Sequence, residues 1–92
     1  MMQKRIHTLI SGRVQGVAFR WVTDDVAHQL NVVGWVRNLP DGRVEVMAEA
    51  EEKVLGEFID FLKKGPRHAV VEDIQIEWMN ATGEFATFEI RH

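Results

Sequence analysis

The hydrophobic positions of this chain change spacing from one segment to the next. Residues 5–11 alternate, with Ile6, Thr8 and Ile10 on one side, which predicts a strand because successive strand side chains point to opposite faces. The hydrophobic positions that follow recur every three or four residues, which is the spacing of one helix face: Phe19, Val22, Val26 and Leu30. The pattern therefore predicts a strand, a short connection and an amphipathic helix over about residues 20–30.

The rest of the chain continues to switch between the two patterns. It predicts a strand over 32–38, a strand over 43–50, a helix over 51–64, a strand over 70–78 and a last short strand over 85–91. A turn at residues 39–42 joins the first two of these strands, because its proline pre-sets the φ angle that a turn needs. Gly65 and Pro66 end the second helix.

The order of these elements predicts an α+β fold. Two helices are expected on one face of an antiparallel-dominated sheet, in a ferredoxin-like βαββαβ sandwich with an extra C-terminal strand. Right-handed crossovers then place the first and third strands in the centre of the sheet.

Composition limits the classes of protein to which the chain can belong. Its 92 residues suffice for a single domain over 1–92 with one hydrophobic core. The chain contains no cysteine, which excludes disulfides, thiol nucleophiles and thiolate metal sites and favours a reducing compartment. The N-terminus lacks an apolar signal segment, and no apolar run is long enough to cross a bilayer. We therefore expect a cytoplasmic protein without a membrane partner.

The charge of the chain argues against nucleic acid as a partner. A formal net charge of −3 and a pI near 5.7 provide no surface of clustered lysine and arginine that could neutralise many phosphates. The predicted strand over 43–50 also lacks the aromatic residues of an RNA-binding sheet. A single small anion can still bind, because backbone N–H groups and one arginine set the local field.

The connection between the first strand and the first helix is the best candidate for such an anion site. Gly12 and Gly16 let the chain curl, N–H groups at a helix start are unpaired, and Arg20 stands in the first helical turn. The segment has neither the Gly-Lys-Ser/Thr ending of a P-loop nor the glycine order of a dinucleotide fold. Taken alone, the residues also fit a simple tight turn followed by a solvated arginine.

Other polar and aromatic residues have structural explanations. Asn38 precedes the predicted turn, where asparagine often caps backbone groups. The four histidines lack metal-ligand spacing, and His7 is the one worth closer attention because it lies on the first strand. The three tryptophans, which are expected to pack in the core or on the sheet, are Trp21, Trp35 and Trp78.

Three segments nevertheless resemble the paired signatures of the acylphosphatase family. They are Gly-Arg-Val-Gln-Gly-Val-Ala-Phe-Arg at 12–20, Gly-Trp-Val-Arg-Asn at 34–38 and Asp-Gly-Arg-Val-Glu at 41–45. Their order and spacing match the family, and the resemblance covers essentially the whole chain. Two departures are Asn31, where the family usually has glycine, and His92, where relatives often end in tyrosine; asparagine also suits the left-handed position after a helix.

The resemblance implies a hydrolase that converts an acyl phosphate and water into a carboxylate and inorganic phosphate. Arg20 and Asn38 occupy the family's catalytic positions, so Arg20 is expected to hold the phosphoryl group and Asn38 to orient the attacking water. The phosphoryl oxygens would also bind backbone N–H groups of Gln15, Gly16, Val17, Ala18, Phe19 and Arg20. No metal or other cofactor is expected, and inorganic phosphate or sulfate should occupy the site.

Two alternatives remain open at this point. A regulatory domain could bind an acyl phosphate without hydrolysing it, since a fold alone does not determine function. The resemblance also includes acylphosphatase-like domains fused to carbamoyl-transfer maturation proteins, so the domain could act within a larger assembly. Nothing in the sequence requires self-association, and we expect a free-standing monomer.

Overall fold

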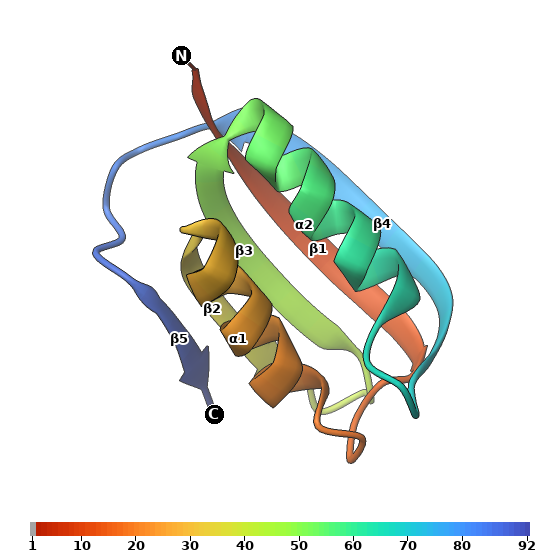
Figure 1. Ribbon diagram of the computed structural model, residues 1–92. Helices are drawn as coiled ribbons and strands as arrows, with labels where there is room; N and C mark the ends of the chain where they lie inside the picture. The colour runs from red at the N-terminus through yellow and green to blue at the C-terminus, as the bar shows by residue number, and fades with distance from the viewer. Residues whose placement is uncertain (1) are drawn as a thin grey trace.

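Two helices cover one face of a five-stranded sheet in the computed structural model, which describes residues 2–92 (Figure 1). In chain order the elements are β1 (Gln3–Arg13), α1 (Phe19–Leu30), β2 (Val33–Asn38), β3 (Val44–Glu51), α2 (Glu52–Lys64), β4 (Val70–Asn80) and β5 (Phe88–Arg91). The α+β fold class is confirmed, and most predicted boundaries lie within two residues of the observed ones. Neither helix is long and apolar enough to cross a membrane among the residues described.

The strands follow the order β4-β1-β3-β2-β5, which places β1 and β3 in the centre as predicted. β1 pairs antiparallel with β3 and β4, and β2 pairs antiparallel with β3. β5 is the extra strand, and it pairs parallel to β2 with Gly34 opposite Phe88. Because β1 and β2 both run antiparallel to β3, they point in the same direction. The loop after β1 and the last residue of β2 therefore lie at the same end of the sheet (Figure 1).

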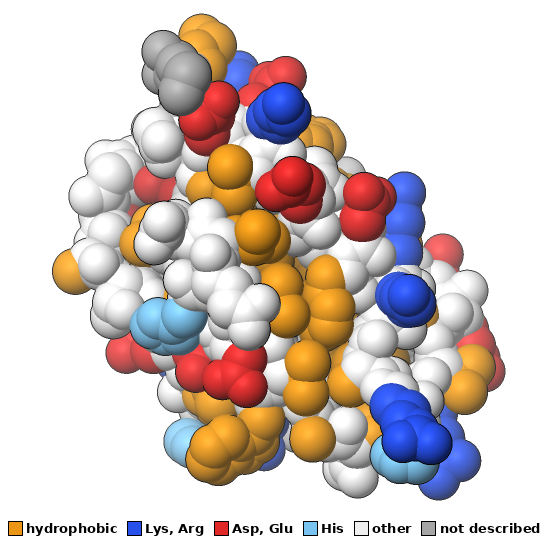
Figure 2. All heavy atoms as spheres, in the orientation of Figure 1, with side chains coloured by type: hydrophobic (Ala, Val, Ile, Leu, Met, Phe, Trp, Pro, Cys, Tyr) orange, Lys and Arg blue, Asp and Glu red, His pale blue; other side chains and the backbone are white. Residues whose placement is uncertain are grey.

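The hydrophobic core lies between the sheet and the helices. Ile6, Thr8 and Ile10 of β1 stand opposite Ala48, Val46 and Val44 of β3, and all six are buried. The buried residues of α2 are Leu55, Phe58, Ile59 and Leu62. Figure 2 shows a band of hydrophobic side chains between the two helices on the outer side of this layer. The period-2 and period-3.6 patterns of the sequence therefore meet in one core.

The opposite face of the sheet carries charged side chains, and one of them is deeply buried. Glu49 is only 3% exposed although it points away from the helices. Its carboxylate accepts hydrogen bonds from Arg5 Nε at 2.6 Å, Thr82 N–H at 2.9 Å and Gly83 N–H at 3.0 Å. The segment after β4 is thereby held across this face.

The last strand is shorter than predicted, because it begins at Phe88 and not at residue 85. The Arg5 guanidinium lies 4.9 Å from the Phe85 ring centroid. The chain reaches β2 two to three residues later, where Gly34 N–H donates to Thr87 O at 3.0 Å and Gly34 pairs with Phe88.

Candidate active site

A β-bulge directs the chain out of β1 and into the loop that carries the predicted site. The register with β4 shifts between Ser11 and Gly12. Gly12 has φ +127°, and a Cβ there would lie 2.2 Å from the carbonyl oxygen of Val70. Only glycine fits so close to the neighbouring strand. The first glycine of the predicted turn is therefore required where the backbone of β1 closely approaches the backbone of β4.

Two left-handed residues then shape the loop before α1. Gly16 has φ +73° and Ala18 has φ +61°. The first helical hydrogen bond runs from Val22 N–H to Ala18 O at 3.0 Å, so the N–H groups of the preceding turn have no helical partner. Outside regular elements, no backbone hydrogen bond between described residues uses an N–H group of residues 15–18. The loop therefore presents free donors at the positive end of a helix.

The loop and the end of β2 enclose one small cavity of 110 Å³. It is lined by Val14, Gly16, Ala18, Phe19, Arg20, Trp21 and Asn38. Phe19 is 2% exposed and packs against Phe61 of α2, with ring centroids 6.4 Å apart, which anchors the helix start. The two residues with predicted catalytic roles thus border the same space. Among the six predicted binding residues, Gln15 and Val17 do not line it.

Asn38 is the last residue of β2; it lines the cavity and carries an unpaired polar atom. Its Oδ1 is buried and accepts no hydrogen bond from the described residues, a condition shared with the hydroxyls of Thr8 and Thr23. A turn-capping asparagine would use this oxygen to accept a backbone N–H. Because a buried acceptor without a partner is costly, the oxygen is suited to a bound water or ligand.

Gln15 holds the loop against the hairpin that carries Asn38. Its Nε2 donates to the carbonyl oxygens of Leu39 at 2.8 Å and Arg43 at 2.9 Å. Sequence reasoning predicted only a backbone role for Gln15 and missed this link. No local signal could have revealed it, because the acceptors lie more than twenty residues away on a different element.

Arg20 faces the cavity without a carboxylate partner among residues 2–92. Its Nη1 lies 3.3 Å from His92 Nδ1. The positive charge of the guanidinium is therefore available to an anion, and its planar fork can bind two oxygens of one phosphoryl group.

One of the three tryptophans packs as predicted. Trp35 of β2 is buried, with the guanidinium carbons of Arg37 and Arg91 at 5.3 Å and 5.1 Å from its ring centroid. Trp78 is 46% exposed, and Trp21 is 70% exposed. Because the face of α1 that carries Phe19 is buried, the Trp21 side chain points outward. The presence of a tryptophan at position 21 is therefore not explained by packing.

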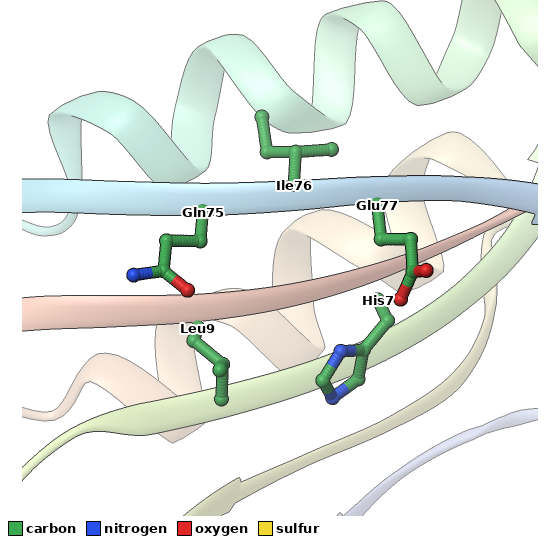
Figure 3. Close-up of a pocket in the computed structure, with 5 residues that line it drawn as sticks. All are labelled: His7, Leu9, Gln75, Ile76 and Glu77. Atoms are coloured by element: carbon green, nitrogen blue, oxygen red, sulfur yellow. The ribbon is translucent and has the colours of Figure 1, made fainter.

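A larger hollow of 350 Å³ lies elsewhere on the sheet, and Figure 3 shows its five lining residues. Ile76 points toward the helices, whereas Gln75, Glu77, Leu9 and His7 point to the open face (Figure 3). These residues come from the middle of two paired strands and offer no cationic fork comparable to Arg20. The hollow is therefore a weaker anion site despite its size.

His7 belongs to this open face and has a structural partner. Its Nε2 lies 2.7 Å from Glu45 Oε2, and Arg37 Nε donates to the other oxygen of Glu45 at 2.6 Å. Burial favours the neutral acid, but the hydrogen bonds from His7 and Arg37 together outweigh it and lower the pKa of Glu45. No group of three or more His, Asp or Glu side chains suited to a metal ion occurs among the residues described.

Comparison with known proteins places this geometry in context. A sequence model of the family described as Acylphosphatase matches residues 6–90. An acylphosphatase of Anaeromyxobacter dehalogenans (strain 2CP-C) is 46% identical over 87 residues, which cover 95% of this chain and 94% of the relative. An acylphosphatase of Marinobacter nauticus (strain ATCC 700491 / DSM 11845 / VT8) is 45% identical over 92 residues, 100% of both chains.

A solved structure agrees with the sequence matches. The crystal structure of acylphosphatase from Bacillus subtilis superposes with a TM-score of 0.90 at 37% identity and covers 100% of both chains. The matches span the glycine loop and the end of β2 as well as the core. The chain therefore belongs to the acylphosphatase family, and the reaction it catalyses is the hydrolysis of acyl phosphates.

Proposed function

We propose that Arg20 and the loop N–H groups of residues 15–20 hold the phosphoryl group of the acyl phosphate, while Asn38 orients the attacking water. The observation that carries this proposal is that Asn38, whose buried Oδ1 has no hydrogen-bond partner among the described residues, lines the same cavity as Arg20. A water bound to this oxygen would satisfy it and would stand beside an anion held by the guanidinium. Residues that line one small cavity thus carry an acceptor suited to water and donors suited to phosphate.

The chemistry requires few catalytic groups. The water oxygen forms a bond to phosphorus while the bond from phosphorus to the acyl oxygen breaks, and its electron pair leaves with the carboxylate. The water proton passes to a phosphoryl oxygen. A carboxylate departs without being protonated, so no general acid is required, and the chain's own groups supply positioning and charge stabilisation. The reaction proceeds on this basis without a metal ion.

The size of each contribution can be bounded. Removal of one donor to a developing oxyanion costs about 3–4 kcal/mol in other enzymes. Arg20 and Asn38 together could then account for several orders of magnitude in rate. Because a lysine is a point charge and cannot form the bidentate contact, Arg20→Lys should also be severely impaired.

The test compares kcat on benzoyl phosphate with inhibition by inorganic phosphate in three variants. Asn38→Ala should lower kcat about 10²–10³-fold and leave the phosphate inhibition constant within about twofold, because Asn38 contacts water and not the anion. Arg20→Ala and Arg20→Lys should lower kcat and also weaken the inhibition by phosphate. The matched controls are Asn80→Ala and Arg37→Ala, which alter an exposed asparagine and an open-face arginine outside the cavity.

Near-normal kcat in Asn38→Ala would show that the water is not positioned by this residue. Activity should persist in the presence of a chelator, and its loss there would contradict metal-independent attack. Phenyl phosphate, a monoester with a poor leaving group, should be hydrolysed far more slowly than benzoyl phosphate. Equal rates on the two substrates would contradict the argument from leaving-group ability.

A further inference from the structure

We propose that Trp21 binds the acyl portion of the substrate and makes the enzyme favour apolar and aromatic acyl phosphates over small polar ones. The inference rests on the proposed phosphoryl site at Arg20 and Asn38. The Trp21 indole has no packing role in the core. Trp21 is 70% exposed, lies one residue after Arg20 in the first turn of α1 and borders the same cavity as Arg20 and Asn38.

The size of the cavity determines where the acyl group must lie. At 110 Å³ the cavity is well below the roughly 300–1,000 Å³ of pockets that enclose a whole small organic ligand. It can receive a phosphoryl group and a water but not an aromatic acyl group as well. The acyl group therefore extends from the phosphoryl group toward the mouth, into contact with the side chains that form the rim.

Trp21 is the lining residue best suited to meet it. Phe19 and Val14 are buried beneath the loop, and Gly16 and Ala18 have little or no side chain. The Trp21 indole alone among these combines a large apolar surface with exposure at the rim. No hydrogen bond or ring contact between the described residues engages it. Its face is therefore free to stack on a planar acyl group.

The chemistry of the acyl group then determines the preference. A benzoyl or long apolar acyl group removes part of its own surface and part of the indole from water, which is favourable in proportion to the area buried. An acetyl or carbamoyl group is small and polar and gains little. Discrimination arises outside the reacting centre, so it leaves the affinity for the phosphoryl group unchanged.

The test measures kcat/KM for benzoyl phosphate and for acetyl phosphate. Trp21→Ala should lower the benzoyl value about tenfold and the acetyl value by less than about twofold, and Trp21→Phe should retain most of the preference because a planar ring remains. Inorganic phosphate, which has no acyl group, should inhibit the wild type and Trp21→Ala equally. The control is Trp78→Ala. Trp78 is a partly exposed tryptophan of β4 that lines a separate surface hollow with Lys4 and Glu52, and none of the site residues lines that hollow.

The decisive quantity is the ratio of kcat/KM for benzoyl phosphate to kcat/KM for acetyl phosphate. If this ratio is unchanged in Trp21→Ala, whether or not both values fall, the acyl contact is overturned. If the ratio is unchanged while Arg20→Ala and Asn38→Ala behave as expected, only this inference fails. If the ratio falls in Trp21→Ala but Asn38→Ala retains its kcat, the assigned role of Asn38 fails and the acyl contact stands. Near-UV circular dichroism of each variant checks that its fold is preserved.

Discussion

Two residues other than glycine have positive φ among the residues described, and they lie at the two ends of α1: Ala18 at +61° and Asn31 at +58°. Asn31 was expected after the helix. There Val32 N–H donates to Ala27 O at 2.8 Å, which is the wide-spanning hydrogen bond of a Schellman motif at a helix end. Asparagine tolerates this conformation because its short polar side chain can form local hydrogen bonds. Ala18 has no such compensation, so its conformation is maintained by the surrounding loop.

Replacing Ala18 by glycine should therefore stabilise the protein. Relief of the left-handed strain outweighs the extra freedom of the unfolded chain, and we expect a gain of about 0.5–1 kcal/mol in the free energy of unfolding by urea. Ala27→Gly, in the buried middle of α1, is the control and should cost about 1 kcal/mol or more. A loss of stability in Ala18→Gly comparable with that control would contradict the account of strain.

At the scale of elements, the site depends on how the β1–α1 loop meets the β2–β3 hairpin. Arg20 belongs to α1 and Asn38 to β2, so neither element alone contains the cavity. The Gln15 side chain joins the two by donating to two carbonyl oxygens of the hairpin. Side-chain to backbone bonds of this kind determine relative position as well as stability.

Gln15→Ala should loosen this junction. We expect a loss of about 1–2 kcal/mol in the free energy of unfolding, because two hydrogen bonds disappear. We also expect a fall in kcat/KM on benzoyl phosphate of about tenfold or more, since small displacements of catalytic groups are costly. Both are measured beside Gln29→Ala, which removes an exposed glutamine of α1 outside the cavity. Wild-type activity in Gln15→Ala would show that the loop keeps its position without the link.

At the scale of the whole molecule, the two faces of the sheet are stabilised differently. The helical face buries hydrocarbon, whereas the open face is closed at one end by the ion pair of Arg5 with Glu49 and by the segment it holds. Burial of Glu49 favours its neutral form, but the loop N–H groups and the Arg5 guanidinium together outweigh burial and lower the pKa of this carboxyl. Stability therefore depends on the carboxylate form of Glu49.

Acid should weaken the fold through this residue. Because the folded-state pKa lies below the reference value of 4.5, the contribution is fully present above that pH and is lost as pH falls through the folded value. Glu49→Gln should cost about 1–3 kcal/mol of unfolding free energy at pH 7, and the difference from wild type should shrink below about pH 4.5. Urea unfolding across pH provides the measurement, with the exposed Glu72→Gln as control. A difference independent of pH would exclude the carboxylate as its source.

Most of the fold could be predicted because hydrophobic periodicity records which side of each element is buried. The strand and helix spacings located every element, and crossover handedness placed β1 and β3 centrally. The start of β5 was missed; Phe85, predicted to begin it, instead contacts Arg5, a residue far away in the sequence. The roles of Arg20 and Asn38 came from the resemblance to a family, because the residues alone favoured a surface arginine and a turn cap; these roles remain predictions.

By itself, the sequence determined the order of elements, the glycine loop, the left-handed helix end at Asn31 and the absence of thiol chemistry. These features depend on neighbouring residues and on composition, which a linear pattern records. The tertiary structure alone decided that Gln15 reaches the hairpin, that Glu49 is buried on an open face and that Trp21 stays exposed beside Arg20. Such contacts depend on which strands become neighbours and on which way the helix turns its side chains once its core face is buried, and local periodicity does not encode either with residue precision.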